Sequence, residues 1–74
     1  SHANLKDAKL NRSILIQTNL QFANLTEATL NHAKLHKADL SNATLIRAKL
    51  NHADLSRANL QSASLIDAVL VEAY

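Results

Sequence analysis

The sequence predicts an all-β solenoid, in which short strand-like segments wind around one axis and pack their apolar side chains inside. Three observations favour this fold class. All fourteen Leu residues occupy multiples of five, from Leu5 to Leu70, and all thirteen Ala residues lie two positions before such a multiple. A third is the absence of Gly and Pro. Every turn must therefore be made by ordinary residues in one repeating conformation.

A period of five excludes the regular elements. In an α-helix, Leu at every fifth position would step by about 140° and spread over all faces of the helix. In a straight strand, an odd period would send successive Leu side chains to opposite faces. Neither a helix nor a flat sheet would therefore bury this pattern.

A coil made of five-residue sides does bury it. Ala and Leu are two positions apart, so they point to the same side of an extended segment and deliver one small and one large side chain to the axis. Four such sides with right-angle corners close a square of about 20 residues, and coils stack about 4.8 Å apart. The 74 residues then form about 3.7 coils. The period alone leaves the number of sides and the handedness open.

The triplets ANL (3–5, 23–25, 58–60) and ADL (38–40, 53–55) carry a resemblance to a known family. They are similar to the A-(D/N)-L-X-X signature of the pentapeptide-repeat family, and the resemblance covers the whole chain. It implies a right-handed quadrilateral parallel β-helix with the Leu and Ala columns inward. We expect one such domain over residues 1–74, either free-standing or part of a longer protein. Ser13 and Thr18 interrupt the Ala column, and we expect each hydroxyl to bond to nearby backbone.

Composition excludes several classes of function. The net charge is +2, with both signs interspersed, which is too little to imply a nucleic-acid or membrane partner. There is no Cys, so disulfide and thiolate chemistry are excluded. No run approaches the roughly 18 apolar residues of a membrane span. We expect a cytoplasmic protein without a cofactor or bound metal.

Outward residues 20 apart form ladders along the faces of such a solenoid. Asn11, Asn31 and Asn51 form one, which we interpret as a stabilising ladder of amides. Asp7, Glu27, Arg47 and Asp67 form a second, in which two adjacent carboxylates resemble the spacing of a glycosidase pair. Five-residue units leave no loops to build a pocket around them. The sequence therefore does not predict an enzyme.

A third ladder contains Arg12, His32, His52 and Glu72 and lies beside Gln17, Lys37 and Arg57. Two stacked His residues fall short of the three or four protein ligands that zinc requires. The stripe is basic, especially below about pH 6.5 where histidine is protonated. No aromatic residues interleave with it, so binding of nucleic acid is not favoured.

The outward apolar residues give the sharper signal, because clustered exposed apolar groups usually mark an interface. Four of them lie in the last nine residues, and Ile46 and Ile66 share one ladder. The candidate interface comprises Ile46, Ile66, Val69, Val71 and Tyr74. It binds a protein partner or a second copy, or it is covered by a following segment. Ile14, Ile16 and Phe22 form a smaller patch with the same alternatives.

The sequence thus favours a non-enzymatic structural or protein-interaction module that presents ladders on a rigid β-helical rod. An alternative comes from the resemblance: some members of the family, which is abundant in bacteria, mimic duplex DNA and bind type II topoisomerases. Those surfaces are strongly acidic, whereas this chain is net positive. Direct binding of nucleic acid through the basic stripe is a third hypothesis.

Overall fold

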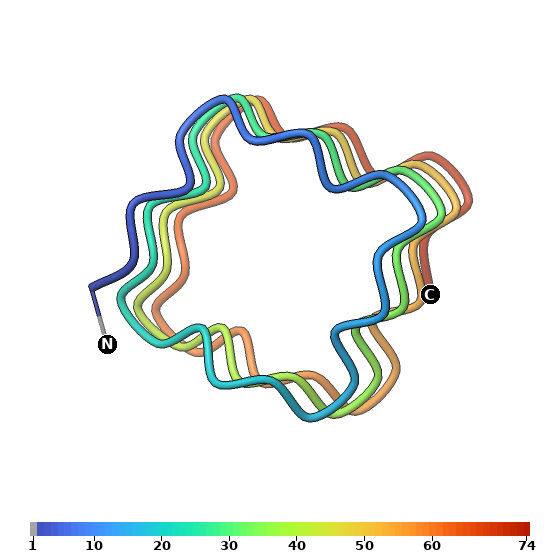
Figure 1. Cartoon of the computed structure of the whole chain (residues 1–74), viewed down its shortest axis with the longest axis horizontal. Helices are drawn as coiled ribbons and strands as arrows, with labels where there is room; N and C mark the ends of the chain where they lie inside the picture. Colours follow the sequence, from blue (N-terminus) through green and yellow to red (C-terminus); the bar gives the residue numbers. More distant parts are fainter. Residues whose placement is uncertain (1) are drawn as a thin grey trace.

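A computed structural model describes residues 2–74. The backbone winds in square coils that stack on one another (Figure 1). Parallel bridges join residues 20 positions apart, beginning with Asn4 to Asn24 and ending with Lys49 to Val69. The described residues contain no helix and no strand longer than a single bridge. This is the right-handed quadrilateral β-helix that the resemblance implies.

Three backbone hydrogen bonds per unit hold successive coils together. The N–H of Leu5 donates to the carbonyl of Asn24 at 2.8 Å, and the N–H of Asp7 donates to the carbonyl of Thr26 at 2.9 Å. In the other direction, the N–H of Asn24 donates to the carbonyl of Ala3 at 2.9 Å. The pattern repeats at every side of the square. Each five-residue unit of the central coils is therefore fixed to the coils on both sides of it.

Each corner is a tight turn whose geometry is that of a type II β-turn. The N–H of Ala8 donates back to the carbonyl of Leu5 at 3.0 Å. The second turn residue of every unit has a positive φ, between 56° and 65°, and none is glycine. Residues other than glycine seldom adopt such a φ, because the Cβ atom then lies too close to the backbone. From Asp7 to His52, each of these residues also donates its N–H to a carbonyl of the next coil, which helps to hold this conformation without glycine.

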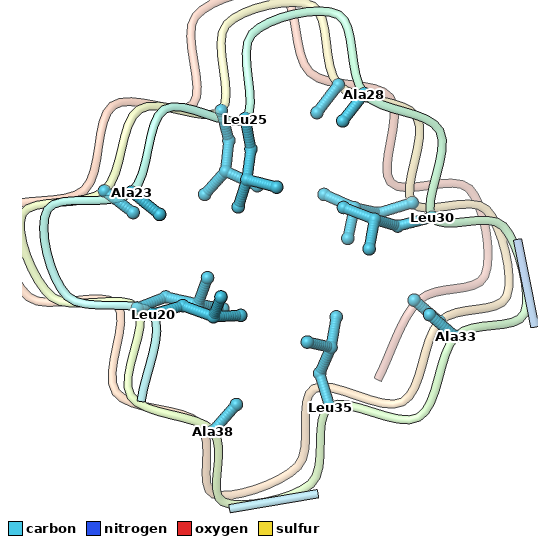
Figure 2. Close-up of a cluster of buried hydrophobic side chains, with 14 residues drawn as sticks. Leu20, Ala23, Leu25, Ala28, Leu30, Ala33, Leu35 and Ala38 are labelled. Carbon is cyan, nitrogen blue, oxygen red and sulfur yellow. The ribbon is translucent and has the colours of Figure 1, made fainter. Parts of the chain in front are cut away.

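The core consists of the inward Leu and Ala columns (Figure 2). From Ala23 to Ala53, every Leu and Ala is at most 1% exposed. Burial falls off toward both ends, where a coil has a neighbour on only one side: Leu5 and Leu65 are half-buried, and Leu70 is 40% exposed. The predicted inward columns are confirmed, and the two central coils supply most of the buried apolar surface.

Two expectations need correction. The coil stack is squat rather than rod-like, because the molecule measures 26 × 21 × 18 Å and its coil axis is the short one (Figure 1). Within residues 2–74, the hydroxyls of Ser13 and Thr18 bond to no backbone group. Both are half-buried in the first coil, so neither is enclosed in the core.

Candidate functional site

Many outward polar side chains serve the turns and are not free for function. The first turn residue of each unit has an N–H that neither the turn nor the inter-coil bonds use. Where Asn or Asp stands two positions earlier, its Oδ1 accepts this bond, as Asn19 does from the N–H of Gln21 at 3.1 Å. Six units use this arrangement, with acceptors Asn4, Asn19, Asn24, Asp39, Asp54 and Asn59.

Two of these acceptors are carboxylates held in their charged form. The Ser41 hydroxyl at 2.7 Å and then its backbone N–H lower the pKa of Asp39 below its ordinary value of 3.8. The Ser56 hydroxyl and N–H lower the pKa of Asp54 in the same way. These shifts come from turn geometry and indicate no catalytic role.

The Asn ladder, defined as Asn11, Asn31 and Asn51, also supplies acceptors for the N–H groups of first turn residues, but across coils. The Oδ1 of Asn11 accepts from the N–H of Asn31 at 3.0 Å, and the Oδ1 of Asn31 accepts from the N–H of Asn51 at 3.0 Å. The predicted stabilising ladder is present, but it joins side chain to backbone rather than amide to amide. The Oδ1 of Asn51 is buried without a partner.

The acidic ladder, defined as Asp7, Glu27, Arg47 and Asp67, contains an ion pair. The guanidinium of Arg47 donates to a carboxylate oxygen of Glu27 at 3.0 Å, and both side chains are largely exposed. The pair neutralises the centre of the ladder between Asp7 and Asp67. This corner therefore has no continuous anionic stripe. Glu27, one of the two acids whose spacing resembled a glycosidase pair, is bound to Arg47.

The His ladder, defined as Arg12, His32, His52 and Glu72, forms a column at another corner. The rings of His32 and His52 stack with centroids 4.8 Å apart and planes 10° apart. The Nε2 of His52 lies 3.4 Å from a carboxylate oxygen of Glu72. Within the described residues, no three His, Cys, Asp or Glu side chains come together in a way that could hold a metal ion.

His36, Ser56 and Asp54 form a chain of hydrogen bonds that contains the residue types of a hydrolase triad. The Ser56 hydroxyl donates to Asp54 at 2.7 Å and lies 2.6 Å from the Nδ1 of His36. Because its single proton is used on Asp54, Ser56 accepts the bond from His36. In a catalytic triad the imidazole stands between serine and carboxylate. Here serine stands in the middle, so no base activates it.

The candidate interface lies on the outer face of the last two coils, and we call it the C-terminal apolar surface. Its exposed fractions are 63% for Ile66, 37% for Val69, 58% for Val71 and 80% for Tyr74, whereas Ile46 is half-buried. Sequence reasoning missed Leu70, which belongs to the inward column but is 40% exposed. Its place in the outermost coil, with no further coil above it, was the available signal.

A groove of about 530 Å³ runs along the coil axis between the Asn ladder and the His ladder. It is lined by the three asparagines, by Arg12, His32 and His52, and at the C-terminal end by Val69 and Val71. The groove thus joins part of the basic stripe to part of the C-terminal apolar surface. Sequence reasoning identified both sets of residues but did not place them around one depression.

The members of the N-terminal patch, Ile14, Ile16 and Phe22, lie on separate ladders, as most members of the C-terminal apolar surface do. The Phe22 ring also lies 5.1 Å from the ring of His2. Ile14 is 71% exposed, which makes it as open to solvent as the members of the C-terminal apolar surface.

Among residues 2–74, no helix has the length and apolar character needed to cross a membrane.

Comparison of the sequence with curated proteins finds no match. Solved structures give two informative similarities. A pentapeptide repeat protein from the cyanobacterium Cyanothece 51142 is 30% identical, with a TM-score of 0.63 over 95% of this chain and 52% of that one. A pentapeptide repeat protein of the Arabidopsis thaliana thylakoid lumen is 32% identical, with a TM-score of 0.51 over 96% of this chain and 52% of that one.

This chain therefore spans about half the length of both proteins. A family model of eight pentapeptide repeats matches residues 3–42 and again residues 38–74. These two matches cover nearly the entire chain, in register with the Leu and Ala columns that form the core. The chain belongs to the pentapeptide-repeat family.

Proposed function

We propose that this chain is a non-enzymatic interaction module, which acts by presenting fixed side-chain ladders to a protein partner. The C-terminal apolar surface is its main contact surface, and in the isolated chain a second copy occupies it. The supporting observation is that neighbouring ladders become apolar together. Ile66, Val69, Val71 and Tyr74 all lie in the last coil, whereas the residues one coil earlier on three of these ladders are Lys49, Asn51 and Asp54.

The fold itself does not require apolar side chains at these four positions. The outward side chains do not contribute to the Leu and Ala core, and polar residues occupy three of these four ladders in the preceding coil. Exposed apolar groups gathered in one region typically bind another protein surface. The polar groups of the described residues, by contrast, form turn contacts and ladders, and where Ser56 meets His36 its hydroxyl proton is donated to Asp54.

The proposal is tested by replacing Ile66 or Val71 with Ser and measuring association by light scattering. Both side chains are exposed, so the circular dichroism spectrum and the unfolding midpoint should stay close to those of the original chain. We expect association to weaken in both variants. Unchanged association in correctly folded variants would contradict the proposed surface.

A further inference from the structure

The groove between the Asn ladder and the His ladder has side-chain amides along one wall. The orientation of two asparagine amides is fixed, because only an oxygen can accept from the backbone N–H groups of Asn31 and Asn51. The Nδ2 groups of Asn11 and Asn31 therefore face away from these bonds. Within residues 2–74 neither Nδ2 group donates a hydrogen bond, so both are available to a ligand.

The opposite wall begins with a cation. Arg12 carries a permanent charge, and the imidazole rings of His32 and His52 follow it in the same ladder, where each ring N–H can donate a hydrogen bond. No carboxylate lines the groove. Glu72, which is not part of the lining, has a carboxylate oxygen 3.4 Å from the Nε2 of His52. Amide donors on one wall, and a guanidinium with imidazole N–H groups on the other, match an occupant that is rich in acceptor oxygens and negatively charged.

The C-terminal end of the groove has the opposite character. Val69 and Val71 form its lining there and are both exposed. Arg12 and Val71 are three coils apart, which corresponds to about 14 Å at the usual coil spacing. An extended peptide covers this length with about four residues. A single short segment can therefore contact both ends.

We infer that this groove binds an extended acidic peptide segment of a protein partner, with an apolar side chain on Val69 and Val71 and acidic side chains toward Arg12 and His32. The inference rests on the proposed function, because it names the chemistry of one partner segment. A phosphate backbone would match the cations but has no apolar group for the two valines. The groove also has no Phe, Tyr or Trp on which nucleobases could stack.

The experiment is an NMR titration of the ¹⁵N-labelled Tyr74→Ser variant with synthetic hexapeptides, because we expect this variant to lack the second copy that otherwise covers Val69 and Val71. The probe has Val at its first position, Asp at its third and fifth, and Thr elsewhere, so that alternate side chains face the groove. The reversed sequence is titrated as well, since the groove admits either direction. We expect shifts of the side-chain amide signals of Asn11 and Asn31, and weaker binding as salt is raised.

Two control probes define the specificity. The same peptide with Asn in place of Asp keeps the shape without the charge, and should bind at least about threefold more weakly. A thymidine hexanucleotide supplies negative charge without an apolar residue. Binding of the neutral peptide or of the hexanucleotide as tightly as the acidic peptide would overturn the proposal. Absence of any shift at millimolar peptide would do the same.

Protein variants test the location. Arg12→Gln and His32→Gln, both at exposed positions, should each weaken binding of the acidic peptide by about threefold. Arg57→Gln removes a charge from the neighbouring ladder outside the groove and should leave binding unchanged. If Arg57→Gln weakens binding as much as Arg12→Gln, the groove is not the site. Tyr74 lies outside the groove, so it tests the proposed function separately. If Tyr74→Ser lowers the solution mass but the acidic peptide does not bind, the proposed function is upheld and the peptide inference fails.

Discussion

The Oδ1 of Asn24 accepts two hydrogen bonds from Thr26, one from the backbone N–H at 3.1 Å and one from the hydroxyl at 2.7 Å. The same relationship recurs between Asp39 and Ser41. It supplies a partner for the one backbone N–H of each unit that the β-helix itself leaves unpaired. This gives a physical reason for Asn or Asp before Leu in the repeat.

Removal of this acceptor should destabilise the fold. We expect Asn24→Ala to lower the free energy of unfolding by roughly 1 to 2 kcal/mol, because a half-buried N–H and a hydroxyl both lose their partner. Asn24→Asp is the matched control, since a carboxylate accepts the same two bonds. Urea unfolding followed by circular dichroism measures both. Equal stability of Asn24→Ala and the original chain would show that the turn does not need this acceptor.

The sequence predicted the core well, because a Leu at every fifth position and an Ala two places earlier can be buried together only in such a coil. It predicted the outer surface less well. The role of Asn24 depends on a turn with a positive φ at Glu27, which no local preference of Glu indicates. The groove depends on how side chains of separate coils lean toward one another. Leu70 looked like a core residue because position in the column does not reveal the lack of a neighbouring coil.

Acid should reduce stability through Asp39 and Asp54. Both pKa values are lowered from 3.8 by serine hydrogen bonds, chiefly from the hydroxyl and next from the backbone N–H. A lowered pKa in the folded state stabilises the fold above the unfolded-state pKa, and this stabilisation is lost as pH falls through the folded-state value. The loss should therefore occur below pH 3.8.

The double variant Asp39→Asn, Asp54→Asn tests this assignment. It keeps an oxygen acceptor for each turn but cannot titrate. Its unfolding midpoint in urea should depend less on pH below 3.8 than that of the original chain. An identical pH profile for the two proteins would mean that other carboxylates cause the acid sensitivity.

Position in the stack should decide the effect of a core truncation. Leu40 is 1% exposed, so Leu40→Ala leaves a cavity and should lower the free energy of unfolding by roughly 3 to 5 kcal/mol. Leu70→Ala makes the same chemical change at a side chain that is 40% exposed, and should cost about 1 kcal/mol. Urea unfolding compares the two. Similar losses at both positions would contradict the burial gradient along the coil axis.

The corner residues should be sensitive to the shape of the side chain at a positive φ. Asn42 has a φ of 61° and lies in a central coil. We expect Asn42→Val to lower the free energy of unfolding by about 1 to 2 kcal/mol, because a β-branched side chain disfavours the left-handed region. Asn42→Gly should change it by only a few tenths. Thermal unfolding measures both variants, and a stable Asn42→Val protein would rule out strain at this corner.

The solution mass of the chain, measured by size-exclusion chromatography with light scattering, tests the interaction function most directly. Val71→Asp and Tyr74→Ser alter the C-terminal apolar surface, while Ile14→Ser is the matched control because Ile14 shares a ladder with Tyr74 at the opposite end and is similarly exposed. We expect a dimer that becomes monomeric in the first two variants and persists in Ile14→Ser. A monomer throughout, or a dimer that only Ile14→Ser dissociates, would contradict it.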